Sequence, residues 1–433
     1  MKLWHQVIIG SGPAGIFAAE AIRERDPESS ITMLTAESSP AHSPVMLTYW
    51  MGGEVGREAL FFRDPSWGER RKIDVRLNTK VNSLHPTSQE LKLEDGRVIS
   101  YDRLLIATGA IPIALSLPRM GSKGVTALRT LADAEAVLES KFIIRKVVII
   151  GGSFIGLKLA CHLREKGLQV TILEKEPKLA ARIFDLKAST LVARKMREKG
   201  IRVETEVEVV EALNEQGWVT GVHLQDGRMF SGQRVIQAVG VRPNTKFLEG
   251  SGIELRGGIV VNERMETNIP GIYAAGDATV TIDSITLERT HNATWAAATR
   301  QGMVAGRNMA GESRRYTHNF ALNALNLFGL RVLSAGHSYY EKQSGLDLLS
   351  RETNEVYRKI IIKDRRLIGF ILGGDVSGTG VLLRLMRKQE RISGDPVDLL
   401  SGPISQEDQL PPHLGYEHGF LFRNLKRKSI AKE

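Results

Sequence analysis

The feature that most constrains the fold of this 433-residue chain is a pattern that occurs twice. Residues 6–22 read QVIIGSGPAGIFAAEAI, and residues 147–163 read VVIIGGSFIGLKLACHL. In both stretches a short apolar run enters a glycine-rich turn and resumes with helical periodicity. That context makes a glycine motif indicative of a dinucleotide-binding turn between a strand and a helix. We therefore expect two nucleotide-binding βαβ units in one chain.

The first copy carries the three glycines in their usual places. Gly10 permits the tight bend, Gly12 lets the backbone approach a pyrophosphate, and Gly15 lets the helix pack on the strand. The amino end of the helix then faces the negative charge. The segment 30–37 is predicted to form the next strand and to end at Glu37, whose carboxylate would bind ribose hydroxyls.

The second copy departs from this pattern at one position. Its turn contains Gly151, Gly152, Ser153 and Gly156, so serine stands where the middle glycine is usual. The serine Cβ would crowd a pyrophosphate slightly, and we expect binding that is retained but adjusted.

The second copy also indicates which nicotinamide nucleotide it binds. Glu174 closes the following strand, where a carboxylate accepts the ribose 2′-hydroxyl and repels a 2′-phosphate. This favours NADH, while the nearby Lys175 and Lys178 leave some use of NADPH open.

In three further segments, a predicted strand ends in small residues. Segments 101–110 (YDRLLIATGA) and 234–244 (RVIQAVGVRPN) are consistent with the chain returning between domains. Segment 267–279 (TNIPGIYAAGDAT) places the Asp277 carboxylate at the edge of a nucleotide-bearing sheet, where it suits a sugar-alcohol hydroxyl.

A single cysteine excludes several kinds of redox chemistry. Because Cys161 is the only cysteine, the chain cannot form an internal disulfide or a CxxC pair, and it cannot hold an iron–sulfur cluster with its own thiolates. The apolar helical neighbours of Cys161 predict a buried packing residue, with a lone nucleophile as the alternative. No apolar run is long enough to span a bilayer, and we expect a cytoplasmic protein without a signal peptide.

The charge balance favours acidic partners. Fifty-nine lysines and arginines oppose 49 acidic residues, for a net charge of +10. Nucleic acid, an anionic membrane or an acidic electron carrier would suit such a surface, as would plain solvation. No nucleic-acid-binding module is recognisable in the sequence.

The order of these motifs resembles the pyridine nucleotide–disulfide oxidoreductase superfamily of two-dinucleotide flavoproteins. The resemblance implies an α/β fold with two Rossmann-like domains, one for FAD and one for NAD inserted into it, and an α+β C-terminal interface domain. The implied limits are 1–115 and 241–315 for the FAD domain, 116–240 for the NAD(H) domain, 316–400 for the interface domain and 401–433 for a basic tail. The tail would be either a docking element for a partner or without structure.

The resemblance also implies the site residues, and no metal site is expected. The implied FAD-binding residues are Gly10, Ser11, Gly12, Pro13, Ala14, Gly15, Glu37, Ser43, Pro44, Val81, Ala107, Thr108, Gly109, Gly276, Asp277 and Trp295. The implied NAD-binding residues are Gly151, Gly152, Ser153, Phe154, Ile155, Gly156, Glu174, Lys175, Val239 and Gly240.

The branch within the superfamily decides where the electrons go. Segment 41–54 lacks the redox cysteine of the disulfide-reducing branches and holds His42, Ser43 and Pro44 instead, so thiolate chemistry is not expected. His42 is expected to be structural, with a proton-donating role as the alternative. Segments such as SPVMLTYW resemble NADH-linked rubredoxin and ferredoxin reductases and the flavin subunits of nitrite reductase, CO dehydrogenase and tungsten aldehyde oxidoreductase systems.

That branch implies an FAD-dependent oxidoreductase passing electrons between NAD(H) and an iron–sulfur partner of the acidic ferredoxin type, within a larger complex. A homodimer through the C-terminal domain is also implied. The alternatives are an NADH oxidase that reduces oxygen, or a basic flavoprotein with a binding role.

One residue departs from the superfamily pattern. Two residues after the last glycine of the NAD motif the superfamily commonly has glutamate, paired in disulfide-reducing members with a lysine beside flavin N5. Here Lys158 occupies that position, and the segment that often supplies the lysine reads HSPVML. Lys158 is therefore expected near N5, where it would favour negatively charged reduced flavin. The alternative is a lysine on an exposed helix face.

Overall fold

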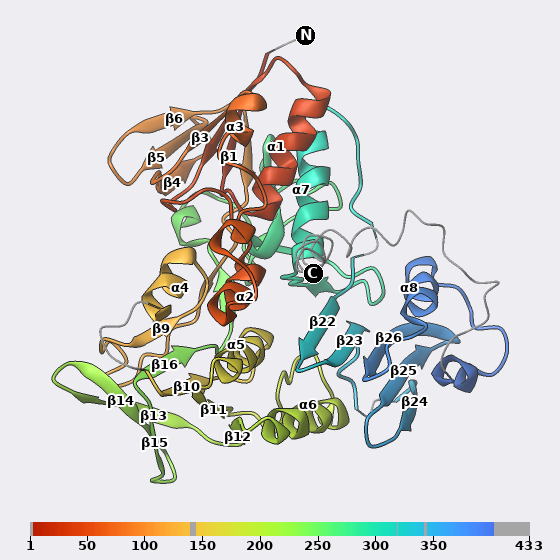
Figure 1. Cartoon of the computed structure of the whole chain (residues 1–433). Helices are drawn as coiled ribbons and strands as arrows, with labels where there is room; N and C mark the ends of the chain where they lie inside the picture. The colour runs from red at the N-terminus through yellow and green to blue at the C-terminus, as the bar shows by residue number, and fades with distance from the viewer. Residues whose placement is uncertain (1–2, 139–143, 318, 342–343, 402–433) are drawn as a thin grey trace, which may run out of the picture.

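The computed structural model describes residues 3–138, 144–317, 319–341 and 344–401 (Figure 1). The predicted docking tail, 401–433, lies outside the described residues except for Ser401. Within the described ranges, no helix is long and apolar enough to cross a membrane.

The first glycine motif lies in a five-stranded parallel sheet with the order β19-β7-β1-β2-β3. Its strands are β1 (His5–Ile9), β2 (Ser30–Leu34), β3 (Ile73–Arg76), β7 (Arg103–Ile106) and β19 (Ile272–Ala274). The sheet therefore joins strands from before and after the second motif. Strands β1, β2, β7 and β19 are mostly buried, whereas the edge strand β3 is partly exposed.

Two helices pack together beside this sheet, α1 (Pro13–Arg25) and α7 (Trp295–Met309) (Figure 1). Their backbones approach closely because α7 carries glycines one turn apart. A Cβ on Gly302 would lie 2.2 Å from the Ala14 carbonyl oxygen, and one on Gly306 would lie 2.3 Å from that of Ala18. The helix that follows the first glycine turn is thus held by a helix almost 300 residues away in the chain.

The second motif lies in another parallel sheet, of order β12-β11-β10-β16-β9. Its strands are β9 (Val125–Ala127), β10 (Lys146–Ile150), β11 (Gln169–Leu173), β12 (Arg202–Glu204) and β16 (Arg234–Gln237). The helices are α4 (Leu131–Leu138), α5 (Phe154–Glu165) and α6 (Leu186–Glu198). A separate antiparallel sheet contains β13 (Val209–Glu215), β14 (Trp218–Leu224) and β15 (Met229–Ser231).

The C-terminal sheet has five antiparallel strands in the order β22-β23-β26-β25-β24, with α8 (Thr379–Lys388) packed on β26. Its strands are β22 (Leu322–Leu327), β23 (Leu330–Gly336), β24 (Asp347–Glu352), β25 (Tyr357–Lys363) and β26 (Arg366–Gly373). The edge strand β24 is mostly exposed and polar, so no apolar alternation marks it.

The remaining α-helices and strands of the described residues are short. They are α2 (Leu47–Gly52), α3 (Trp67–Arg70), β4 (Val81–His85), β5 (Glu90–Leu93), β6 (Val98–Ser100), β8 (Ala110–Pro112), β17 (Val241–Pro243), β18 (Ile259–Val260), β20 (Thr279–Ile282) and β21 (Arg289–Thr290). Strands β8 and β17 pair where the chain leaves the first sheet and returns to it. The domain limits expected from the sequence stay a proposal.

Candidate functional site

Both glycine turns lie where the strand order of their sheet reverses, the position at which parallel sheets bind ligands. After β1, Gly10 has φ +110° and donates a backbone hydrogen bond to Leu34 O at 2.8 Å. A Cβ on Gly10 would lie 2.1 Å from the Ala107 carbonyl oxygen, and one on Gly15 would lie 2.0 Å from that of Gly10. Only glycine fits at these two positions.

The second turn repeats this construction after β10. Gly151 has φ +104°, and a Cβ there would lie 2.5 Å from the Ala238 carbonyl oxygen. A Cβ on Gly156 would lie 2.5 Å from the Gly151 carbonyl oxygen. Ala238 and Val239 therefore lie against the second turn as Ala107 and Thr108 lie against the first. Contact of Val239 and Gly240 with NAD stays a prediction.

The amino terminus of α1 fits a pyrophosphate. Its N-cap is Gly12, no side chain caps the helix, and Pro13 occupies the first turn. No heavy atom lies within 4 Å of a Cβ built on Gly12, so the space in front of the helix is open. The first backbone N–H groups and the helix dipole can therefore be offered to an anion, as FAD binding requires.

The amino terminus of α5 is arranged differently. The Ser153 hydroxyl accepts a hydrogen bond from Gly156 N at 3.4 Å and caps the helix. The Glu174 carboxylate accepts one from Gly152 N at 2.5 Å. Glu174 therefore reaches the glycine turn, and its contact with a ribose stays a prediction.

Two lysines near Glu174 are already paired. Lys175 Nζ lies 2.7 Å from Glu208 Oε1, and Lys178 Nζ lies 2.6 Å from Glu341 Oε1. The charges that would attract a 2′-phosphate are thus partly neutralised, which favours NADH.

The prediction that the second strand ends at Glu37 is wrong. Strand β2 ends at Leu34, three residues before Glu37. Glu37 lies in the following loop, with Oε2 at 3.5 Å from Nδ1 of the buried His42. This contact supports a structural role for His42.

The Asp277 turn is held by residues that the sequence analysis missed. Gly276 has φ +81° and donates its N–H to Oε1 of the buried Gln301 at 2.7 Å. The Asp277 carboxylate accepts a hydrogen bond from Arg129 at 2.9 Å, and its backbone carbonyl lies 2.7 Å from His291 Nε2. The turn is thus fixed from α7 and from the loop before α4.

Arg129 links the two halves of the site. It lies just before α4, after the second sheet's edge strand β9, yet pairs with Asp277 beside the first sheet. A Cβ on Gly109 would also lie 3.4 Å from its guanidinium. No local motif marks this arginine, because its partner lies 148 positions away.

The other residues predicted for FAD lie on four different elements. Trp295 opens α7 and packs edge-on against Phe62, with ring centroids 5.0 Å apart. Val81 is buried at the start of β4, and Ser43 precedes the short turn that begins at Pro44. The Thr108 hydroxyl donates to Asn244 O at 2.8 Å. Their contact with FAD stays a prediction.

Lys158 does not point to solvent from an exposed helix face. It is half-buried on α5, with Nζ 3.4 Å from the Tyr49 hydroxyl and 5.2 Å from the centre of that ring. Tyr49 belongs to α2, so the lysine lies between the two nucleotide-binding units. Burial lowers the pKa of Lys158, and the Glu54 carboxylate opposes that change.

Cys161 is a buried packing residue, as predicted. Its thiol lies 3.6 Å from Met196 Sδ, and only 4% of the residue is exposed. Burial raises the pKa of Cys161, and the carboxylates of Glu165 and Glu54 raise it further. The thiol stays protonated, which removes thiolate chemistry from this site.

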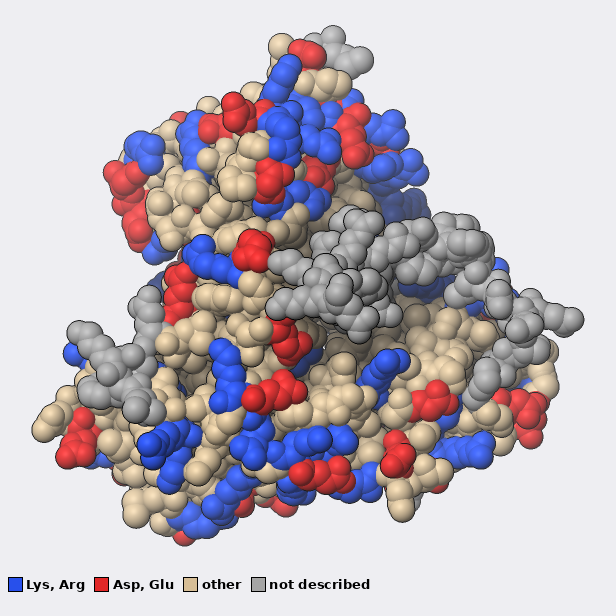
Figure 2. Space-filling view, viewed as in Figure 1, with Lys and Arg blue, Asp and Glu red and all other residues tan. Residues whose placement is uncertain are grey.

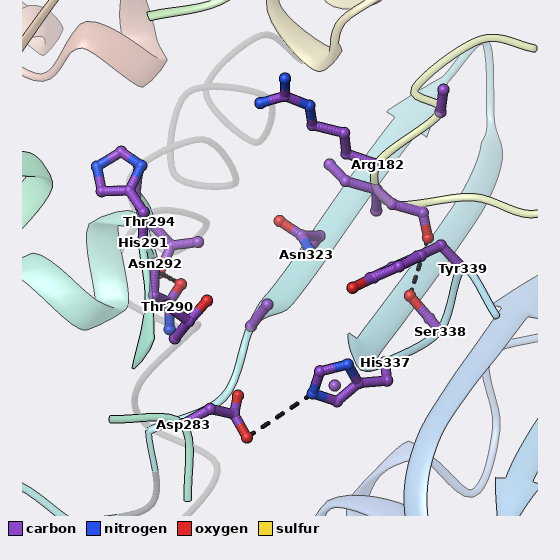
Figure 3. A pocket seen from close by; sticks show the side chains of 15 residues that line it. Arg182, Asp283, Thr290, His291, Asn292, Thr294, Asn323, His337, Ser338 and Tyr339 are labelled. Atoms are coloured by element: carbon purple, nitrogen blue, oxygen red, sulfur yellow. Dashed lines mark hydrogen bonds and ion pairs between the residues drawn. The ribbon is translucent and has the colours of Figure 1, made fainter. Parts of the chain in front are cut away.

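A pocket of about 480 Å³ opens beside the Asp277 turn (Figure 3). Its walls come from loop 181–183, the segment before α7 and strand β23. His291, which contacts Asp277, lies on one wall, and an ion pair between His337 and Asp283, 3.8 Å apart, lies on another. Residues of the C-terminal sheet and His291, which contacts Asp277, therefore line the same pocket.

Two glycine turns of the same construction, one in each parallel sheet, are typical of a protein that binds two dinucleotides. Residues 4–302 match the pyridine nucleotide-disulphide oxidoreductase family, and residues 322–390 match the rubredoxin NAD⁺ reductase C-terminal domain. The chain belongs to the pyridine nucleotide-disulphide oxidoreductase family, as the sequence analysis predicted, and is an oxidoreductase.

Known proteins are similar over most of the chain. A nitrite reductase [NAD(P)H] of Bacillus subtilis is 29% identical over 93% of the chain, which spans only 49% of that relative. The epsilon subunit of an NADH-dependent phenylglyoxylate dehydrogenase of Aromatoleum evansii is 31% identical over 92% of the chain and 95% of the relative. The solved NADH:rubredoxin oxidoreductase of Clostridium acetobutylicum has a TM-score of 0.76 and 25% identity, covering 92% of this chain and 99% of that one.

Proposed function

We propose that the chain is an FAD-dependent oxidoreductase that passes electrons between NAD(H) and an iron–sulfur protein or subunit of the ferredoxin or rubredoxin type. The observation that carries this proposal is the repeated glycine crevice, with α5 of the second unit packed against α2 of the first. The first crevice would hold FAD and the second NAD(H). When bound, FAD accepts electrons in pairs from a nicotinamide and can release them singly.

The residues around the first crevice have separable tasks in this proposal. The open amino terminus of α1 would bind the pyrophosphate, and Asp277, oriented by Arg129, would hold the ribityl chain. Lys158 would lie at the junction of the two crevices, where its ammonium stabilises negative charge that develops during hydride transfer. Packing against Tyr49 restrains the lysine and removes part of its hydration.

The acceptor is inferred from three features. The C-terminal region matches a rubredoxin reductase domain, the only thiol of the chain is buried and protonated, and the net charge of +10 suits an acidic partner. On the face shown in Figure 2 both signs of charge are interspersed, so the positive excess is not confined to one patch there. A homodimer, a larger complex and a cytoplasmic location stay predictions.

The test is NADH turnover by the FAD-reconstituted protein under argon. We expect rapid reduction of a one-electron dye and of an acidic [2Fe–2S] ferredoxin or a rubredoxin, with a rate that falls as salt screens the charges. A protein that turns over only when oxygen is admitted would be an NADH oxidase. Slow turnover under all conditions would favour a binding role. Either result would contradict the proposal.

A further inference from the structure

Three potential metal ligands meet where α2 and α5 pack together, outside the glycine crevices. They are Glu54, just after α2, and His162 and Glu165, both on α5. One ligand atom from each lies within 4.8 Å of the other two. We propose that these three residues bind a divalent transition metal of the Zn²⁺ type, which would connect the two nucleotide-binding units.

The histidine is the strongest part of the argument. His162 is only 6% exposed, and its Nδ1 lies 2.5 Å from Glu54 Oε1 and 3.7 Å from Glu165 Oε2. Nδ1 nevertheless makes no hydrogen bond within the described residues. A buried ring nitrogen that faces two carboxylates and makes no hydrogen bond can serve as a metal ligand.

The surrounding structure fixes the ligands before any metal arrives. A Cβ on Gly52 would lie 2.8 to 2.9 Å from the His162 side chain, so the backbone of α2 closes on the imidazole. Gly53 ends α2 in a left-handed conformation, and Glu54 N donates to Tyr49 O at 3.0 Å. This cap fixes the backbone of Glu54, while Glu165 follows His162 by three residues on the same helical face.

The local charges favour a bound cation. Within the described residues, His162 is the only Lys, Arg or His side chain within 4 Å of either carboxylate. A divalent ion would relieve the repulsion between the Glu54 and Glu165 carboxylates.

One nitrogen and two carboxylate oxygens leave a fourth tetrahedral position for water. Both carboxylates are about half exposed, at 44% and 49%, so an ion can reach the site from solvent. An imidazole ligand favours Zn²⁺ over Mg²⁺, which prefers oxygen ligands. The site departs from the expectation of no metal and is independent of the proposed electron acceptor.

The experiment is equilibrium dialysis of the chelator-treated, FAD-reconstituted full chain against Zn²⁺ and, separately, Mg²⁺. We expect one Zn²⁺ per chain, a higher Tm with Zn²⁺, and little Mg²⁺ binding. Glu165→Gln, on the exposed side, and His162→Gln should each weaken Zn²⁺ binding at least about tenfold. The matched control is His223→Gln, which removes a histidine paired with a single carboxylate, Glu211 at 3.3 Å, and should change nothing.

Two results would overturn the proposal. One is wild-type Zn²⁺ binding no tighter than that of the triple variant Glu54→Gln, His162→Gln and Glu165→Gln. The other is binding that Glu165→Gln and His162→Gln leave unchanged, which would place the ion elsewhere. Because Glu165 is exposed, its variant should fold even where His162→Gln does not. Neither result depends on the electron acceptor.

Discussion

Replacing Gly302 by alanine tests whether the close packing of α7 on α1 shapes the first crevice. The new Cβ would lie 2.2 Å from the Ala14 carbonyl oxygen, against about 3.5 Å for an ordinary contact between non-bonded atoms. The helices must therefore separate by about 1 Å. The neighbouring Gln301, which accepts the Gly276 N–H, would move with α7 and displace the Asp277 turn relative to α1.

The sign of the effect distinguishes two explanations. Helix propensity alone predicts that glycine to alanine within a helix stabilises by up to about 1 kcal/mol. Overpacking costs about 1–3 kcal/mol, and a contact of 2.2 Å with a backbone oxygen belongs in the upper half of that range. Subtracting the gain of up to about 1 kcal/mol leaves an expected net loss of about 1–2 kcal/mol. For a domain of this size that corresponds to a fall in Tm of roughly 2–8 °C. We also expect weaker retention of FAD, because the α1 terminus and the Asp277 turn no longer align.

The assay is thermal unfolding of apo and FAD-reconstituted protein, with the FAD content measured after dialysis. Gly121→Ala is the matched control, because no heavy atom lies within 4 Å of its Cβ and its φ is not positive. A Gly302→Ala protein with unchanged or higher Tm and full FAD content would refute the reasoning.

Three further predictions follow from single contacts. Lys158→Met should retain FAD but slow flavin reduction by NADH at least about tenfold, or 1.4 kcal/mol, in stopped flow, whereas Lys146→Met should not; a wild-type rate would return Lys158 to a packing role. Lys359→Met leaves Asp185 buried beside Tyr357 without its cation at 2.8 Å, and should cost about 3–5 kcal/mol in urea unfolding. The exposed pair of Lys187 and Glu352 is its control, since Lys187→Met should cost less than about 1 kcal/mol; equal losses would contradict this. Glu174→Ala should reduce the preference in kcat/KM for NADH over NADPH at least about tenfold, and an unchanged preference would show that Glu174 does not select the nucleotide.

The sequence by itself determined the two glycine turns and most of what surrounds them. Gly10 and Gly151 need a positive φ, and that demand is local enough to leave a motif. The carbonyls that they approach, of Ala107 and Ala238, follow a neighbouring strand that lies far away in the chain. Strands β1 and β10, which precede these turns, are mostly apolar and buried, so their positions were also predictable. The end of β2, the strand after the first turn, was not. The family, the two parallel sheets and the buried Cys161 followed from the same patterns.

Only the tertiary structure decided which distant residues meet at these turns. Arg129 reaches Asp277 across 148 positions, α7 approaches α1 through two glycines, and His162 on α5 faces Glu54 beyond the end of α2. Each of these residues has an ordinary local sequence, because its role depends on a partner in another element. Local periodicity records which face of an element is buried, but the partner on that face is set by how the sheets and helices pack.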